Sequence, residues 1–188
     1  MCRRCGAELD SVRNDCGCRG RLRSLTRLRS AVAYEGPIEP AVHRFKYLGW
    51  RRLAVPFAEL MAERLAIEGV AAAAAVAVPL HASRQRQRGY NQSELLLREL
   101  RELLALRSPS GSLVRIRATP PQVGHDRIRR FENVGGAFAW RGPPLAGEAI
   151  LLIDDVATTG ATLDACASAL RAAGSGPVTG VSLARVNV

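Results

Sequence analysis

The order of apolar and polar positions predicts short buried strands that alternate with covering helices. Compact apolar runs ending at glycine, proline or charged residues are typical of strands, and leucines and alanines spaced three and four apart are typical of helices. Strands are expected at 31–36, 74–80, 113–116, 137–140, 149–153 and 178–186, and helices at 38–49, 51–69, 93–106 and 161–174. This order implies right-handed crossovers and a mainly parallel sheet flanked by helices, the α/β class.

Polar and basic segments separate these elements. Residues 20–30 are interpreted as a basic connector, residues 83–93 as part of a long polar loop, and a basic helix is expected around Arg127 and Arg130. The 188 residues, 47% of them hydrophobic, suffice for one substantial core and a small appendage. No uncharged apolar run reaches about eighteen residues and no signal-peptide core follows Met1, so a cytoplasmic protein without membrane insertion is expected.

Positive charge is concentrated in the first two thirds of the chain. The net charge is +10, and residues 1–130 carry 24 basic against 12 acidic side chains. Of the 27 basic residues 26 are arginine, and Lys46 is the single lysine. These arginines fit either ordinary solvated surfaces or an anionic partner such as phosphate, pyrophosphate or nucleic acid.

Four of the five cysteines lie within the first eighteen residues, at Cys2, Cys5, Cys16 and Cys18. Because the cytosol keeps thiols reduced and zinc prefers tetrahedral thiolates, this density favours a structural Zn²⁺ knuckle over disulfides. The alternative is an unstructured cysteine-rich tail that binds no metal. We expect a knuckle at residues 1–22 and a second domain at 23–188, with Cys166 as a small core residue of the latter.

Two adjacent acids, Asp154 and Asp155, follow the most apolar of the predicted strands. Because strand side chains alternate, the two point to opposite sides, and they suit recognition of a ribose diol and of a water on Mg²⁺ better than a paired acid–base role. The stretch "ATTGAT" at 157–162 then offers small residues, hydroxyls and a glycine at the start of a helix, which is typical of a phosphate site. Ordinary helix capping explains one such residue but not the whole set.

The stretch "AILLIDDVATTGAT" at 149–162 resembles the phosphoribosyl pyrophosphate (PRPP) signature of type I phosphoribosyltransferases. The resemblance implies that Asp154 and Asp155 hold the ribose hydroxyls. It assigns the 5′-phosphate to the turn formed by Ala157, Thr158, Thr159, Gly160, Ala161 and Thr162. The glycine-rich motifs of P-loop and Rossmann nucleotide sites are absent from the sequence.

The likeness extends along nearly the whole chain. The cysteine knuckle, residues 31–54, 78–96 and 117–138, and the PRPP signature, in that order, resemble the ComF family of competence-associated proteins. This implies a type I phosphoribosyltransferase fold and a link with natural transformation, the uptake of single-stranded DNA. It does not identify an acceptor for phosphoribosyl transfer.

Residues 83–93 are the second candidate site. In an extended loop Arg84, Arg86 and Arg88 would face one side, beside Asn91 and Gln92, and related transferases place their pyrophosphate-binding loop here. Arg84 and Arg88 are favoured as ligands, and the alternative is a surface loop that meets solvent or nucleic-acid phosphates.

Residues 119–130 resemble the mobile hood that closes over PRPP in related enzymes. Thr119 and Gln122 would lie at its tip, and Arg127 and Arg130 would share one helical face. The alternative is a solvated basic helix. Some relatives use a hood lysine on the departing pyrophosphate, but Lys46 lies in another segment, so arginines and Mg²⁺ would neutralise that leaving group.

No residue stands out as a general base, although His81 is the best placed of the three histidines. Around Lys46, the aromatics Phe45, Tyr47 and Trp50 are interleaved with charge, a pattern that can stack exposed bases, and at least one of them is expected in the core. Two functions therefore remain open. One is a PRPP-dependent phosphoribosyltransferase of unknown acceptor; the other is a single-stranded DNA-binding competence factor that keeps the PRPP site without turnover, and both kinds of protein would work with competence-machinery proteins.

Overall fold

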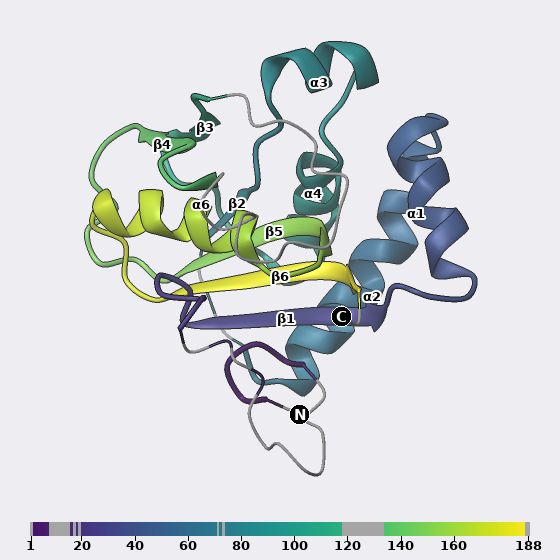
Figure 1. The fold of residues 1–188 in the computed structure, drawn as a ribbon, viewed down its shortest axis with the longest axis horizontal. Helices are drawn as coiled ribbons and strands as arrows, with labels where there is room; N and C mark the ends of the chain where they lie inside the picture. The colour runs from purple at the N-terminus through teal and green to yellow at the C-terminus, as the bar shows by residue number, and fades with distance from the viewer. Residues whose placement is uncertain are drawn as a thin grey trace.

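The protein has the predicted α/β architecture, built on a parallel sheet with helices on both faces (Figure 1). The computed structural model describes residues 2–7, 16, 18, 20–70, 72, 74–117 and 134–186. The strands are β1 (Arg27–Ala33), β2 (Ala74–Ala77), β3 (Ser112–Arg115), β4 (Phe138–Arg141), β5 (Ile150–Ala157) and β6 (Val178–Arg185). The helices are α1 (Ile38–Tyr47), the short 3-10 helix η1 (Arg51–Leu53), α2 (Ala54–Ile67), α3 (Ala82–Arg88), α4 (Gln92–Leu104) and α6 (Ala161–Ala172).

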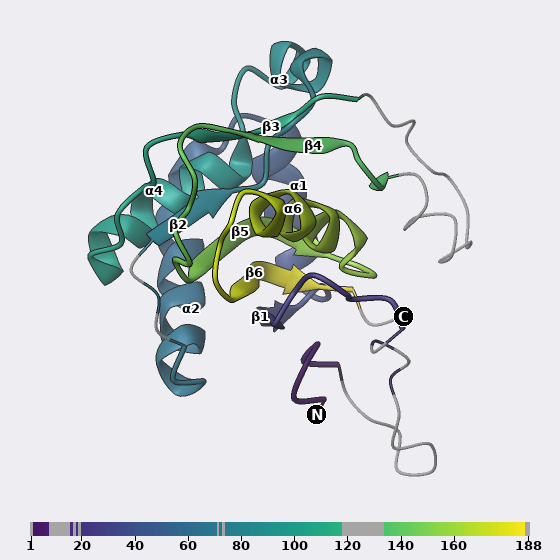
Figure 2. The same cartoon turned by 90° about the vertical axis from the view of Figure 1, so that its left-hand side faces the viewer.

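The main sheet has the strand order β1-β6-β5-β2, and all of its pairs are parallel. Strands β3 and β4 form a separate antiparallel pair. Helices α2 and α4 cover one face of the main sheet, whereas α6 and the β3–β4 pair lie on the other (Figure 2). No helix in the described ranges combines the length and apolar character that crossing a bilayer requires.

Strand β5 is apolar throughout its first half because both of its faces are covered. Leu151 and Ile153 pack in the core with α2 and α4, whereas Ile150 and Leu152 pack in the core with α6. All four side chains are at most 1% exposed. A continuous apolar run is what a parallel strand between two helical layers requires, so this part of the prediction is confirmed.

The first strand begins earlier than predicted. Residues 20–30 were expected to be a connector and 31–36 a strand, but β1 starts at Arg27 and pairs with β6. The arginine-rich sequence concealed this strand because Arg29, only 5% exposed, is accommodated by an ion pair with Glu68 rather than by solvent. The other predicted strands and apolar helices overlap the observed ones, and the predicted basic helix lies outside the described residues.

Candidate functional site

The candidate site lies at the carboxyl ends of β2 and β5, where the chain leaves the sheet in opposite directions. The segment after β2 leads to α3 and α4, and the segment after β5 leads to α6 on the other face. The pairing of β2 with β5 ends at Ala77 and Ile153, while β5 continues beside β6 as far as Ala157. In parallel α/β sheets, ligands commonly bind where the connections diverge in this way.

The acidic pair, Asp154 and Asp155, begins one residue after the pairing with β2 has ended. Asp154 accepts a hydrogen bond from the Ser93 hydroxyl at 3.0 Å, in the first turn of α4. Asp155 forms an ion pair with Lys46 of α1, with 2.9 Å between Nζ and Oδ1. The two side chains thus have different partners, Ser93 of α4 and Lys46 of α1.

The electrostatics of the acidic pair are unusual for aspartates. Burial and the neighbouring Asp155 carboxylate raise the pKa of Asp154 to about 7, although Lys46, the Asp155 N–H and Ser93 oppose the shift. Burial would lower the pKa of Lys46, but the Asp155 carboxylate more than offsets this and raises it. The acidic pair is therefore a partly desolvated anionic centre with one ammonium bound to it.

The 157–162 turn joins β5 to α6 and is shaped by Gly160. Gly160 has φ +81°, and a Cβ there would lie 3.0 Å from methyl carbons of Leu22 and Leu28. The Thr159 hydroxyl accepts from the Ala161 N–H at 3.3 Å, and α6 begins at Ala161. Since the first N–H groups of a helix have no partner within it, this turn offers donors and a positive dipole end to an anion.

The arginine segment is helical, so the predicted extended loop is wrong. Residues Ala82–Arg88 form α3, which ends at Gly89 with φ +77°. Arg84 and Arg88 are four residues apart and share one face of α3, whereas Arg86, two residues from each, does not. The helix keeps the two favoured arginines together and separates the third from them.

Asn91 and Gln92 are buried in contacts that hold the chain after α3. The Asn91 amide donates to the Val78 carbonyl at 3.0 Å, and its oxygen accepts from the Ser93 N–H, which caps α4. Gln92 accepts from Arg88 at 2.9 Å and donates to the Lys46 carbonyl at 3.3 Å. Through these contacts, Asn91 and Gln92 hold the start of α4 in place next to the acidic pair.

The remaining sequence candidates are placed as follows. His81 caps α3, and its Nδ1 lies 2.8 Å from the Ser83 hydroxyl. The hood candidates Thr119, Gln122, Arg127 and Arg130 lie outside the described residues.

The aromatic residues near Lys46 divide between the core and the surface, as expected. Phe45 is fully buried, whereas Tyr47 is 59% and Trp50 is 53% exposed. The Arg88 guanidinium lies 4.7 Å from the Tyr47 ring centre, and that of Arg44 lies 5.2 Å from the Trp50 ring centre. We call these four residues the aromatic–arginine surface: Arg44, Tyr47, Trp50 and Arg88.

The four N-terminal cysteines form a cluster that fits a tetrahedral metal. Their sulfur atoms all lie within 4.8 Å of one another, with 3.7 Å between Cys2 and Cys18 and 3.5 Å between Cys5 and Cys16. Zinc–sulfur bonds of about 2.3 Å imply sulfur–sulfur separations of about 3.8 Å in a tetrahedron. Burial raises the pKa of Cys5 and of Cys18. Burial also acts to raise the pKa of Cys2, but hydrogen bonds from the Cys5 N–H and from neighbouring thiols outweigh it and lower that pKa to about 6.

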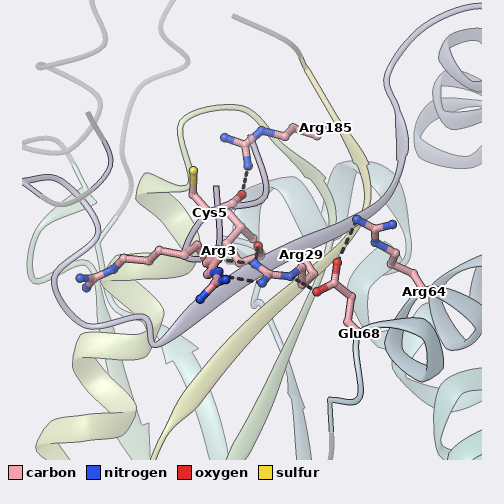
Figure 3. A network of polar contacts seen from close by, with 8 residues as sticks. Arg3, Cys5, Arg29, Arg64, Glu68 and Arg185 are labelled. Carbon is pink, nitrogen blue, oxygen red and sulfur yellow. Dashed lines mark hydrogen bonds and ion pairs between the residues drawn. The ribbon is translucent and has the colours of Figure 1, made fainter. Parts of the chain in front are cut away.

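The cysteine cluster is fastened to the sheet by arginines. Arg29 of β1 donates to the Arg3 carbonyl at 2.7 Å and pairs with Glu68 at 2.7 Å, while Arg185 of β6 donates to the Cys5 carbonyl (Figure 3). Cys5 and Cys18 also share the hydrophobic core that contains the α6 side chains. The cluster and the 157–162 turn are thus parts of one packed layer.

Asp164, in the first turn of α6, connects this helix directly to the segment that follows the cysteines. Its Oδ1 accepts from the backbone N–H groups of Ser24 and Leu25, both at 2.9 Å. Arg4 donates to the carbonyls of Leu22 and Leu25 from the cysteine side. The segment 22–25 is therefore held between the cysteine cluster and α6.

Sequence reasoning missed Lys46 and Ser93 as neighbours of the acidic pair. They lie 109 and 62 residues before Asp155 along the chain, and no local period marks them. The one available hint was that Lys46 is the only lysine among 27 basic residues.

Comparison with known proteins identifies relatives that span almost the entire chain. The DNA utilization protein YhgH of Escherichia coli (strain K12) is 30% identical over 188 residues, covering 95% of this chain and 81% of its own length. Competence protein F of Haemophilus influenzae is 29% identical over 194 residues, covering 98% and 84%. No family model matches the chain. The alignment with the Escherichia coli protein, at 30% identity, covers four fifths of that protein's length. The chain therefore belongs to the ComF family, whose motifs its own sequence resembles.

Proposed function

We propose that this protein binds PRPP between the acidic pair and the 157–162 turn and transfers its phosphoribosyl group to an acceptor during DNA uptake in natural transformation. One observation supports it most: two carboxylates and a helix N-terminus meet at the divergence point of a parallel sheet. The acidic pair offers acceptors for two ribose hydroxyls. The turn offers N–H donors, threonine hydroxyls and a dipole end for the 5′-phosphate.

In this reaction the bond from C1′ to pyrophosphate breaks, pyrophosphate leaves with the bonding electrons, and an acceptor nitrogen forms the new bond and releases a proton. Arg84 and Arg88, on one face of α3, are the proposed cations for the pyrophosphate. Mg²⁺ supplies further neutralisation when bound, and carboxylate oxygens of the acidic pair are the donor type that it prefers. The hood role of Thr119, Gln122, Arg127 and Arg130 remains part of the proposal.

Calorimetric titration with PRPP and Mg²⁺ tests the binding step. The double variant Asp154→Asn, Asp155→Asn keeps the shape of both side chains and removes the anionic acceptors, so it should give no binding heat. Glu59→Gln, an exposed change on α2, is the matched control and should bind like wild type. If wild-type protein gives no heat with PRPP, the proposal fails. A pyrophosphate-release assay against amine and nucleobase acceptors then tests turnover.

A second candidate function is binding of single-stranded DNA, and the aromatic–arginine surface favours it. Exposed rings with guanidinium groups beside them suit stacking of unpaired bases and contact with phosphates. The names of the relatives, DNA utilization protein and competence protein, agree with such a role. Fluorescence anisotropy with a labelled oligonucleotide tests it: Tyr47→Ala with Trp50→Ala should weaken binding at least about tenfold.

Leu103→Ala is the control for that experiment. Leu103 is also half exposed, but it lies at the far end of α4, away from the aromatic–arginine surface. Binding should also weaken steeply as salt rises, since phosphate contacts release counterions. Affinity that is insensitive to salt, or equal losses in both variants, would remove the DNA-binding function.

We further propose that the cysteine cluster binds a structural Zn²⁺ and that residues 1–22 act as a knuckle attached to a domain at 23–188. The sulfur geometry and the four cysteine ligands support this. The protein would then work in the cytoplasm with competence-machinery proteins, receiving incoming DNA. Metal analysis of purified protein should find one zinc per chain, and its absence would remove the zinc proposal.

A further inference from the structure

The 157–162 turn rests on side chains that come from the segment after the cysteines. A Cβ on Gly160 would lie 3.0 Å from methyl carbons of both Leu22 and Leu28, so these two side chains pack directly against the turn. Leu22 is 1% exposed and Leu28 is fully buried. The Leu22 N–H donates to the Cys18 carbonyl at 2.8 Å. One backbone hydrogen bond therefore links a cysteine of the cluster to a side chain that supports the turn.

Arg4, which lies between the first two cysteines, holds the same segment from the other side. Its guanidinium donates to the carbonyl of Leu22 and, at 3.2 Å, to that of Leu25. Its own carbonyl accepts from the Leu28 N–H at 2.8 Å. All three leucines of the segment are therefore bonded to the backbone or the side chain of one residue in the cysteine cluster.

Helix α6 is attached to this segment at its first turn. The two N–H groups that Asp164 accepts, those of Ser24 and Leu25, lie between the leucines that pack against Gly160. The N–H groups proposed to bind a phosphate belong to the same turn of α6. A shift of the segment 22–28 would thus move both the floor of the 157–162 turn and the start of the helix.

A metal ion in the cysteine cluster would fix the segment at both ends. The first pair of cysteines flanks Arg4, and the second pair ends at Cys18, which is bonded to Leu22. A zinc ion bonded to all four sulfur atoms joins the two pairs and so holds Arg4 and Leu22 in one arrangement. Without the ion, thiol contacts and the contacts of the segment itself would have to do this.

We propose that the segment 22–28 couples the cysteine cluster to the 157–162 turn, so that Zn²⁺ in the cluster strengthens binding of a phosphate group at the turn. Leu22 is the positioning residue in this coupling: it contacts the turn and does not itself touch the ligand. The inference rests on the proposed PRPP function and on the proposed zinc site. Because coupling is reciprocal, a bound phosphate must strengthen zinc binding by the same factor.

The first test measures that factor in both directions on the wild-type protein. Ribose 5-phosphate is the probe, since it has the phosphate and the diol without the pyrophosphate. Calorimetry compares its affinity for zinc-loaded protein and for protein freed of zinc, with circular dichroism to follow the fold. Competition with a coloured chelator gives the zinc affinity with and without saturating ribose 5-phosphate, and a blank without protein corrects for zinc held by the probe. Both factors should be equal and at least about fivefold.

The second test removes the positioning side chain. Leu22→Ala keeps all four cysteines, so zinc binding without the probe should stay as in wild type, whereas the coupling factor should fall to about one. Leu22→Met, which keeps an apolar side chain of similar volume, should restore the coupling. Leu100→Ala is the matched control: it truncates a fully buried leucine in the core under α2 and α4, and it should keep the wild-type factor.

Equal coupling in Leu22→Ala and wild type overturns the proposal, and so does an equal loss in Leu22→Ala and Leu100→Ala, because the coupling would then depend on overall stability. If Leu22→Ala does not fold, the wild-type factors decide. Zinc-free protein that is unfolded also overturns the proposal, since every ligand of the folded state would then be linked to zinc.

The outcomes for this inference and for the proposed function differ. Ribose 5-phosphate and PRPP that bind equally well with and without zinc refute the coupling, and the proposed function is unaffected. Zinc-loaded wild type that binds neither compound refutes the proposed function, and the coupling is refuted with it.

Discussion

Replacing Asp164 by alanine should destabilise the protein more than its place in a helix suggests. Two backbone N–H groups, those of Ser24 and Leu25, donate to one carboxylate oxygen at 2.9 Å, and Asp164 is only 9% exposed. Alanine leaves both donors without that acceptor, at about 1–2 kcal/mol each, and removes a negative charge from the first turn of α6, worth about 0.5 kcal/mol. The expected loss is about 3 kcal/mol, or about 6–12 °C in Tm for a chain of this length.

Asp164→Asn is the informative comparison, because the amide keeps the oxygen that accepts both bonds. It loses only the charge, so we expect a loss of about 1 kcal/mol. Glu63→Ala, an exposed change on α2, should stay within about 0.5 kcal/mol of wild type. Urea unfolding followed by circular dichroism measures all three variants. A cost for Asp164→Asn equal to that of Asp164→Ala, or no cost for either, would refute the assigned role of the two hydrogen bonds.

Three further changes test other contacts. Gly160→Ala should cost at least about 1–2 kcal/mol in urea unfolding and weaken binding of inorganic phosphate, because Gly160 has φ +81° and a Cβ would press on Leu22 and Leu28. Glu68→Gln should cost about 2 kcal/mol at pH 7, since it leaves buried Arg29 without its anionic partner. The hydrogen bond from Arg29 lowers the pKa of Glu68. The ion pair therefore stabilises the protein fully at a pH above the ordinary glutamate pKa, and this stabilisation is lost as the pH falls through the lowered pKa. The difference between Glu68→Gln and wild type should accordingly shrink in acid. If the cysteine cluster binds zinc as proposed, a chelator should lower the Tm, which calorimetry with and without added zinc measures.

The strands of the main sheet were predictable where their burial is complete. Ile150 and Leu152 face one core while Leu151 and Ile153 face the other, so the sequence shows an unbroken apolar run whichever side is considered. The acidic pair follows that run directly, which made its position at the carboxyl end of β5 predictable as well.

The start of β1 and helix α3 were predicted wrongly, because tertiary contacts and helix caps stabilise them rather than a buried apolar face. The start of β1 contains Arg27 and Arg29, which suggest a solvated segment, yet Arg29 is buried by Glu68 and by backbone carbonyls. Helix α3 has no buried residue and therefore no apolar period; its caps at His81 and Gly89 define it instead. In both cases tertiary contacts or capping decide the structure, and neither leaves a hydrophobic pattern in the sequence.

The position of Lys46 beside Asp155 could not be predicted for a different reason. It depends on how α1 packs, and that packing is set by Phe45 against Phe57 and by the contacts of Tyr90 and Gln92. None of these residues shows, in its own stretch of sequence, which element it will contact. The sequence therefore predicted the acids of the candidate site but not the cation that accompanies them.

Alternation along β5 places the acidic pair on two sides of the sheet, and this limits what can bind both carboxylates. Ser93 of α4 nevertheless reaches Asp154 and Lys46 of α1 reaches Asp155, so both carboxylates can be contacted at the end of the strand. Beyond Ala77, where the described residues contain no strand paired with β5 on that side, a compact ligand can approach the backbone edge and meet both. The neighbouring hydroxyls of the ribose that we propose as the ligand would fit that approach, with the phosphate directed toward α6. The early end of β2 is therefore the feature that would let one ligand meet both carboxylates of the proposed site.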